Sequence, residues 1–182
     1  MIYFLRHQET VNNQLGMISG QSDSLIRKQS FYADNSKIVK NIDVVYSSPA
    51  QRCIDTLNGI QDLLVSPIID KRLLERNMGD FENCLRKEVY AQYPNLFWNI
   101  HGKIQFRFEF TPPNGESFSE FFERIFSFCE EEIFSNKECN ILICSHNQAL
   151  KIIYFILKGV HPSEENWRNL SFPNGKCVPY IF

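Results

Sequence analysis

The sequence has 182 residues, of which 43% are hydrophobic and 22% are charged, a length that suffices for one well-buried core. Its formal net charge of -2 gives no broad basic field for nucleic acid or anionic lipid. The longest apolar window, around IIYFILKGV, is too short to cross a bilayer, and Arg6 interrupts the first apolar run too early for a signal peptide. We therefore expect a soluble, cytoplasmic protein with a single domain over residues 1–182 and without nucleic-acid or membrane partners.

Six cysteines are scattered along the chain, with no C-x-x-C pair and no Cys/His cluster at zinc-ligand spacing. In a chain without an export signal we expect reduced thiols, several of which pack as small apolar residues. The sequence therefore predicts neither a structural metal site nor a disulfide framework.

Three short apolar segments have the character of buried parallel strands. They are partly β-branched and bounded by polar residues: IYFL at 2–5, IDVVYSS at 42–48 and NILICS at 140–145. The stretches between them carry helical spacing. Strands that alternate with helices predict an α/β layered domain, in which ligands collect at the carboxyl ends of the strands.

Two predicted helices are defined by their apolar faces. Pro49 suits the first turn of one, whose face consists of Cys53, Ile54, Leu57, Ile60 and Leu64. Ser117 and Glu120 have the spacing of a capping box at the start of the other. Its apolar face consists of Phe118, Phe121, Phe122, Ile125, Phe126, Cys129 and Ile133.

The segment 80–113 is irregular in pattern and rich in aromatic residues, and Pro112 and Pro113 close it. We interpret it as a lid-like insertion over one end of the sheet.

Cationic side chains follow three of the predicted elements at the same edge of the sheet. Arg6 and His7 end the first strand, Arg52 lies in the first turn after the second, and His146 ends the third. Like charges gathered in one cleft repel each other and need a counter-ion. Guanidinium groups bind phosphate oxygens bidentately, and the helix N-termini beyond Ser48 and His146 add backbone N–H donors. The pattern therefore predicts a phosphate site.

The segments around these residues resemble the histidine phosphatase superfamily, also called phosphoglycerate mutase-like proteins, over nearly the whole chain. FLRHQET is similar to the family's Leu-Arg-His-Gly-Glu-Thr signature, SSPAQRCIDT to its Ser-Ser-Pro-x-x-Arg-x-x-x-Thr segment, and ICSHNQALK to its second-histidine motif. LLERNMGDFEN, PPNGESFSEFF and LSFPNGKCVPYIF are similar to its Glu-x-x-x-Gly, Pro-x-Gly-Glu-Ser and closing-strand segments. The resemblance implies a phosphoglycerate mutase-like fold, a three-layer sandwich with a mostly parallel central sheet flanked by helices.

The resemblance also implies a set of catalytic roles that needs no metal and no cofactor. His7 would be the nucleophile that forms a phosphohistidine, which splits one difficult displacement into two easier ones. Arg6, Arg52 and His146 would hold the oxygens of the transferring phosphoryl group. Glu75 would protonate the leaving oxygen and later activate water.

Several positions depart from the family pattern. Gln8 stands where a small residue is usual, so its side chain either donates a hydrogen bond to the phosphate or crowds the pocket. Asn13 and Gly20 align with the Asn-x-x-x-Arg-x-x-Gly segment, but Met17 replaces its arginine, and Asn147 replaces the glycine after the second histidine. Gln8, Asn13 and Asn147 are our candidate substrate-binding residues.

The favoured function is a metal-independent phosphatase that hydrolyses a small phosphorylated metabolite through a phosphohistidine on His7. One alternative is a phosphoglycerate mutase-type phosphotransferase, against which stand the short insertion and its few cations: Arg86, Lys87, Lys103 and Arg107. The other alternative is a non-catalytic member that binds a phosphate ligand. Charge near Arg86 and Lys87 also suggests a second anion site, and the sequence assigns no oligomeric state.

Overall fold

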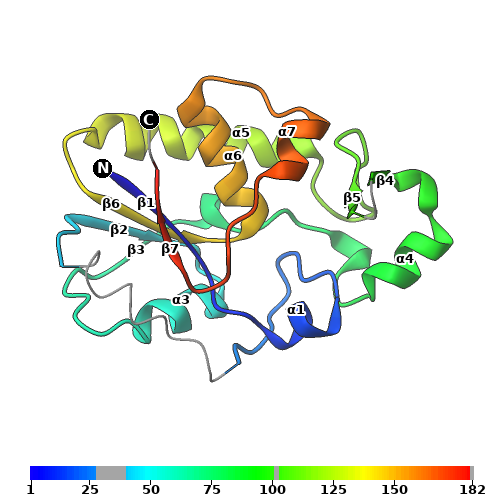
Figure 1. Ribbon diagram of the computed structural model, residues 1–182, viewed down its shortest axis with the longest axis horizontal. Coiled ribbons are helices and arrows are strands. Elements are labelled where there is room, and N and C mark those ends of the chain that lie inside the picture. Colours follow the sequence, from blue (N-terminus) through cyan, green and yellow to red (C-terminus); the bar gives the residue numbers. More distant parts are fainter. Residues whose placement is uncertain (28–39, 101–102, 181–182) are drawn as a thin grey trace.

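The computed structural model describes residues 1–27, 40–100 and 103–180 (Figure 1). Its centre is a five-stranded sheet with the strand order β3-β2-β6-β1-β7. The strands are β1 (Ile2–Arg6), β2 (Val44–Ser47), β3 (Ile68–Ile69), β6 (Ile141–Ser145) and β7 (Cys177–Pro179). β7 runs antiparallel to β1, whereas the other neighbours are parallel, so the three predicted strands are confirmed as β1, β2 and β6.

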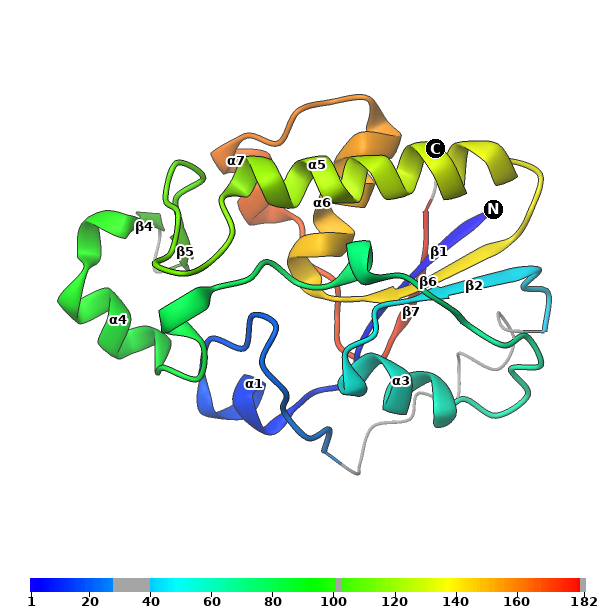
Figure 2. The same cartoon turned by 180° about the vertical axis from the view of Figure 1, so that it is seen from behind.

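Helices cover both faces of this sheet, as Figure 2 shows. α3 (Gln51–Asn58) lies on one face, and α5 (Phe118–Phe128) and α6 (Asn147–Lys158) lie on the other. The shorter helices are α1 (Val11–Leu15), α4 (Arg86–Gln92) and α7 (Glu164–Asn169), with a 3₁₀ turn η1 (Lys71–Leu73) after β3. The predicted three-layer sandwich with a mostly parallel sheet is therefore confirmed.

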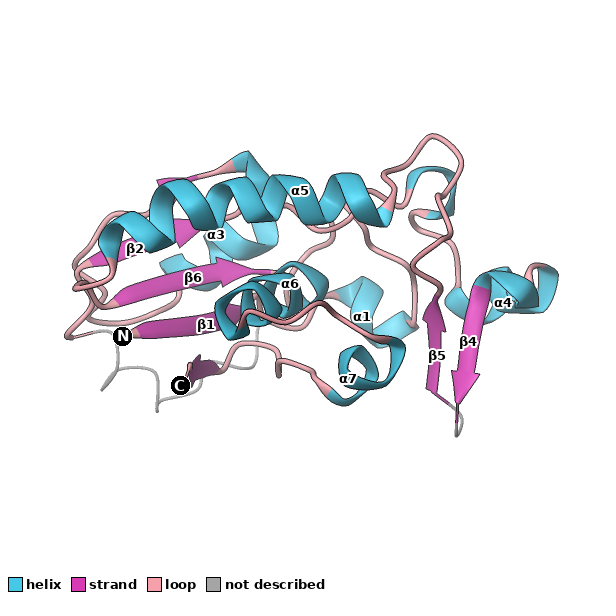
Figure 3. Cartoon of the chain, turned by 90° about the horizontal axis from the view of Figure 1, so that it is seen from above, coloured by secondary structure: helices cyan, strands magenta, loops and turns pink. Residues whose placement is uncertain are grey.

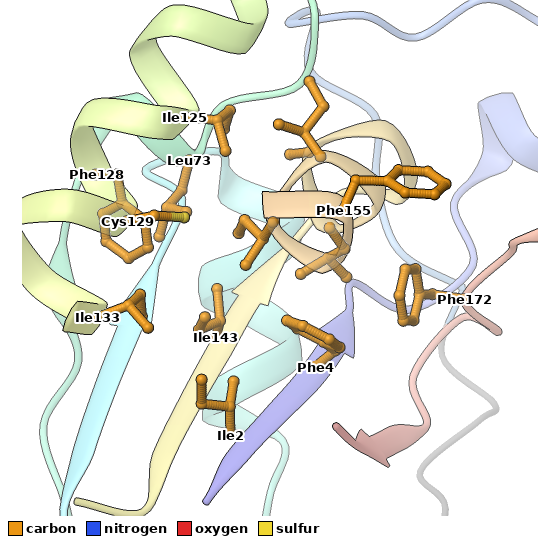
Figure 4. Close-up of a cluster of buried hydrophobic side chains, with 14 of the residues drawn as sticks. Ile2, Phe4, Leu73, Ile125, Phe128, Cys129, Ile133, Ile143, Phe155 and Phe172 are labelled. Carbon is orange, nitrogen blue, oxygen red and sulfur yellow. The ribbon is translucent and has the colours of Figure 1, made fainter. Parts of the chain in front are cut away.

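Alternation along the strands divides the core into two layers. Phe4 belongs to the cluster beneath α5 and α6, whereas Leu5 belongs to the cluster that includes Cys53 and Leu57 of α3. Because successive strand side chains point to opposite faces, a strand covered on both faces must be apolar throughout. The larger cluster, shown in Figure 4, fills the space between the sheet and the two long helices.

α5 begins as expected and buries most of the predicted face, with one exchange between two phenylalanines. The Ser117 side chain accepts a hydrogen bond from the Glu120 backbone N–H, and the Glu120 carboxylate accepts one from the Ser117 N–H, so the capping box is confirmed. Phe128, absent from the predicted face, is fully buried, whereas Phe126 is 38% exposed. The helix continues as a π-helix η4 (Cys129–Ile133) and a 3₁₀ turn η5 (Phe134–Asn136).

The helix after β2 is shorter than predicted. α3 starts after Ala50, so Pro49 lies outside it, and Gly59 forms its C-cap. Ile60 lies beyond the helix but still packs against the same cluster as Cys53 and Leu57, whereas Leu64 is 93% exposed. The predicted helix was therefore too long, and its predicted apolar face was wrong at Leu64.

The segment 80–113 is more regular than predicted. It contains the end of η2 (Gly79–Phe81), then α4, η3 (Pro94–Leu96) and an antiparallel hairpin of β4 (Phe97–Ile100) and β5 (Lys103–Phe106). Aromatic rings tie the hairpin together, with the Phe97 and Phe106 centroids 4.1 Å apart. Figure 3 shows the parallel strands β1 and β6 of the main sheet pointing toward the side where α1, α4 and this hairpin lie.

No helix in the described part of the chain combines the length and apolar character needed to cross a bilayer.

A pair of phenylalanines in α5 tests this packing. Phe128→Ala should lower the free energy of unfolding by about 3–5 kcal/mol, because it opens a cavity between the helix and the sheet. Phe126→Ala, at an exposed position of the same helix, should cost less than about 1 kcal/mol. Urea unfolding followed by tryptophan fluorescence measures both, and equal losses would contradict the described packing.

Candidate active site

A cavity of about 130 Å³ opens where β1 and β6 end and α6 begins. Seven of the eight predicted site residues line it: Arg6, His7, Asn13, Arg52, Glu75, His146 and Asn147. Gln8 is the exception and does not line the cavity. Its side chain is 2% exposed, and its backbone N–H donates to Thr56 Oγ1 at 2.8 Å.

His7 is held as a neutral imidazole of defined tautomer. Its Nδ1 lies 2.6 Å from the backbone oxygen of Gln8, and a carbonyl accepts only, so Nδ1 carries the proton. Burial lowers the pKa of His7 to about 3, and the charges of Arg52 and Arg6 act in the same direction. Nε2 therefore keeps an unprotonated lone pair at neutral pH.

His146 is also neutral but has the opposite tautomer. Arg52 donates from Nε to His146 Nδ1 at 3.2 Å, so Nε2 carries the proton and donates to Ser48 Oγ at 2.9 Å. Burial, followed by the Arg52 charge, lowers the pKa of His146 well below its usual value. The His7 and His146 ring centroids are 5.2 Å apart. The expected cluster of four positive charges is thus two charged arginines beside two uncharged imidazoles.

The two arginines differ in how their donors are used. Arg6 donates from Nη1 to the Phe172 carbonyl at 3.1 Å, while its buried Nε has no partner among the described residues. Arg52 is 2% exposed and donates to the carbonyls of Ser22 and Gly20, at 2.6 and 2.7 Å, as well as to His146. These bonds fix the guanidinium and leave two of its five N–H groups for other acceptors.

Glu75 faces the cavity from the segment after η1. Its carboxylate accepts from the backbone N–H of Gln148 and of Arg76, each at 3.1 Å. Loss of hydration raises the pKa of Glu75, although these two hydrogen bonds and the charges of Arg52 and Arg6 oppose the shift. A carboxyl with a raised pKa keeps its proton over a wider pH range than an ordinary carboxyl, and a shifted carboxyl in a cavity is a candidate for proton transfer.

Arg124 of α5 holds this segment in place. Its guanidinium donates to the carbonyls of Arg72, Leu74 and Glu75 at 2.6 to 2.9 Å. It also forms an ion pair with Glu116, at 2.6 Å from Nε to Oε1. Glu116 therefore anchors this arginine.

The two candidate asparagines use their side-chain oxygens within the protein. Asn13 Oδ1 accepts from the Thr10 N–H at 3.1 Å, which completes the capping box of α1. Asn147 Oδ1 accepts from the Phe172 N–H at 3.0 Å. Their amide nitrogens remain as the groups that can donate to a ligand.

Sequence reasoning missed several lining residues. Ser19 lines the cavity with a buried Oγ that has no partner in the described ranges. Arg86 and Gln148 also line it, yet neither was a candidate for this cavity. Met17 lies in the wall where the family resemblance places an arginine. Of these residues only Arg86 carried a signal, its charge.

No group of three or more His, Cys, Asp or Glu side chains in residues 1–27, 40–100 and 103–180 is placed to hold a metal ion.

Comparisons with known proteins agree with this geometry. A family model described as the histidine phosphatase superfamily (branch 1) matches residues 2–179. Phosphoserine phosphatase 1 of Hydrogenobacter thermophilus is 26% identical over 171 residues, covering 90% of this chain and 78% of that protein. The 2,3-bisphosphoglycerate-dependent phosphoglycerate mutase of Cytophaga hutchinsonii is 27% identical over 175 residues, covering 90% of this chain and 80% of that protein.

Solved structures agree in fold. The alpha-ribazole phosphatase from Shigella flexneri superposes with a TM-score of 0.70 at 23% identity, over 97% of this chain and 87% of that chain. The structure of Bacillus stearothermophilus YhfR superposes with a TM-score of 0.75 at 21% identity, over 97% and 88%. The sequence relatives support phosphatase chemistry at the level of the family. This chain belongs to the histidine phosphatase superfamily, branch 1.

Proposed function

We propose that this protein hydrolyses a small phosphorylated metabolite through a phosphohistidine on His7. One observation carries the proposal: a neutral histidine with a free Nε2 lies in a cavity with two arginines and a carboxyl of raised pKa. A nucleophile, cations for the phosphoryl oxygens and a proton donor are what metal-free phosphoryl transfer needs. The cavity volume of about 130 Å³ lies below the range typical of drug-sized ligands, which favours a small substrate.

The reaction follows in two steps. The lone pair on His7 Nε2 attacks phosphorus, the bond from phosphorus to the ester oxygen breaks, and Glu75 gives its proton to that oxygen. Water then attacks the phosphohistidine, Glu75 takes a proton from the water, and the bond between phosphorus and nitrogen breaks. Inorganic phosphate leaves, and both residues return to their starting states.

Buried donors around the cavity supply the oxygen contacts. Arg6 Nε and Ser19 Oγ have no partner among the described residues, and such groups are costly to bury unless a ligand binds them. Arg52 contributes its remaining N–H groups. A bound dianion would favour a second proton on His146 Nδ1, which would then donate to a phosphate oxygen in place of accepting from Arg52, while Nε2 keeps its bond to Ser48.

A phosphoglycerate mutase-type reaction is the second candidate, because relatives of that name are 26–27% identical. A mutase must protect its phosphohistidine from water until an acceptor binds, whereas a phosphatase must not. Hydrolysis without an acceptor therefore separates the two functions. A non-catalytic member would bind orthovanadate but hydrolyse no ester.

The first test is p-nitrophenyl phosphate hydrolysis in the presence of excess chelator. His7→Ala should lower kcat by at least about 1000-fold, because the other neutral imidazole of the cavity, His146, uses its lone pair to accept from Arg52. His161→Ala, at an exposed histidine outside the cavity, is the matched control and should keep wild-type turnover. Chelator-sensitive turnover, or activity that survives His7→Ala, would refute the proposed chemistry.

The same assay should show the lowered pKa of His7. With a pKa of about 3, the side chain stays unprotonated as the pH falls through the usual histidine value of 6.5. The value of kcat/KM should therefore not decrease between pH 7.5 and 6. A decrease with a midpoint near 6.5 would show an ordinary histidine instead.

Glu75→Gln should separate the two chemical steps. Nitrophenolate leaves with little need of protonation, so the first step should persist, while water activation without a base should slow turnover about 100- to 10,000-fold. The expected result is a burst of one nitrophenolate per active site followed by slow release. Steady turnover without a burst would contradict the assigned role. Glu82→Gln replaces another carboxylate of the same segment that does not line the cavity and serves as the control.

Ser48→Ala should weaken binding of inorganic phosphate about 5- to 30-fold, because the Nε2 proton of His146 would lose its acceptor. Ser47→Ala is the matched control, since Ser47 is equally buried but donates to the Ser48 carbonyl. Competitive inhibition constants measured from pH 5.5 to 8 give the comparison. Equal constants and equal pH profiles for the two variants would remove Ser48 from the site.

A further inference from the structure

The peptide between His7 and Gln8 is held from two sides. Its carbonyl oxygen accepts a hydrogen bond from the Asn174 side-chain amide at 2.9 Å, and its N–H donates to Thr56 Oγ1 at 2.8 Å. The carbonyl and the N–H of a planar trans peptide point in opposite directions, so the two bonds oppose rotation of the peptide about the line that joins its Cα atoms. The backbone directly after the candidate nucleophile is therefore fixed.

The Thr56 hydroxyl is used both as a donor and as an acceptor, which fixes its orientation. It donates to the Arg52 carbonyl, one turn earlier in α3, at 2.6 Å, and it accepts from the Gln8 N–H, which can only donate. Thr56 is 2% exposed, so it is shielded from water that would replace either bond. A side chain of a helix on one face of the sheet thus holds the backbone that follows β1.

Asn174 holds the carbonyl side of the same peptide from the segment that precedes β7. The Gly175 N–H donates to the Arg6 carbonyl at 2.9 Å, and Asn174 forms an isolated bridge with Arg6. These backbone contacts place the Asn174 amide beside the His7 carbonyl. The peptide after His7 is therefore held between α3 and the approach to β7.

This peptide determines where the next carbonyl points. The Gln8 carbonyl accepts from His7 Nδ1 at 2.6 Å, and only the two backbone dihedrals of Gln8 separate it from the held peptide. If the peptide rotated, that carbonyl would move and Nδ1 would lose its acceptor. The ring could then carry its proton on Nε2, and its lone pair would lie on Nδ1, where the proposed reaction cannot use it.

Neither Thr56 nor Asn174 lines the cavity that contains His7. Their contribution to the reaction can therefore come only through the groups that they hold. Thr56 holds two such groups, the Gln8 N–H and the Arg52 carbonyl. An experiment must separate an effect on the nucleophile from an effect on the arginine.

We propose that Thr56 and Asn174 are positioning residues, which set the tautomer of His7 by holding the His7–Gln8 peptide between them. Gln8 then contributes to the site through its backbone and not through its side chain. This inference rests on the proposed phosphohistidine reaction and adds two residues that act on the nucleophile from outside the cavity.

Thr56→Val is the main test, because valine keeps the shape of threonine and lacks the hydroxyl. For p-nitrophenyl phosphate it should lower kcat/KM about 10- to 100-fold, while the inhibition constant of inorganic phosphate stays within about twofold of the wild-type value. Thr56→Ser keeps the hydroxyl and should restore kcat/KM to within about threefold of the wild-type value. Asn174→Leu removes the amide at a half-buried position and should lower kcat/KM in the same way as Thr56→Val.

Nitrogen-15 NMR of histidine-labelled protein reads the tautomer itself. The chain has four histidines, and the His7→Ala spectrum identifies the signals of His7. At neutral pH the wild-type ring should be protonated on Nδ1, whereas Thr56→Val and Asn174→Leu should also show the form protonated on Nε2. Thermal unfolding checks that each variant is folded, and Asn174→Leu decides the result alone if Thr56→Val is unfolded.

Two outcomes would overturn the proposal while leaving the phosphatase function in place. One is a wild-type kcat/KM in both folded variants. The other is a tautomer that stays intact while kcat/KM or phosphate binding falls, which would show that Thr56 acts through Arg52. A wild-type protein that hydrolyses no ester would instead refute the phosphatase function, and the NMR spectra would still test whether the held peptide sets the tautomer.

Discussion

The site depends on the removal of water from the end of β1. His7 and His146 stay uncharged between two arginines because burial penalises their protonated forms, and both lowered pKa values have this first cause. The sheet supplies the burial, since β1 is paired on both sides and covered on both faces. The uncharged state of His7 therefore depends on the packing of the whole sheet and not on one neighbouring residue. The hydrogen bond to the Gln8 carbonyl then selects which nitrogen keeps the lone pair.

Chain connectivity explains how distant residues meet in one cavity. Parallel pairing brings the ends of β1, β2 and β6 to one edge of the sheet. Residues as far apart in the sequence as Arg6 and His146 therefore become neighbours. The Glu75 carboxyl group comes from a different part of the chain, after η1, and the first turn of α6 binds it through the Gln148 N–H. The N-terminus of α6 therefore orients the Glu75 carboxyl group and lies next to His146.

The sequence was sufficient for the sheet centre and for the local motifs. IYFL, VVYS and ILICS are short and apolar because both faces of the strands are covered, and a short run of this kind between polar residues is typical of a buried strand. The sequence was not sufficient for α5, where Phe126 and Phe128 both fit an apolar stripe and only packing against the sheet separates them. The hairpin in 80–113 was missed because each strand has only four residues, and the contact of Phe97 with Phe106 forms only when the strands pair. Ser19 and Gln148 carry no charge or motif that marks them before the chain folds.

Arg124 separates two parts of the molecule that face the same cavity. It ties the backbone of Arg72, Leu74 and Glu75 to α5, so the acid is positioned from the main sandwich. The β4–β5 hairpin and α7, which form part of the wall of a neighbouring cavity, make none of these bonds. Substitutions in the hairpin and α7 can therefore accumulate without moving the Glu75 carboxyl group. The architecture is evolvable in a specific sense, because selection can change what the enzyme recognises while the reaction it performs is inherited intact.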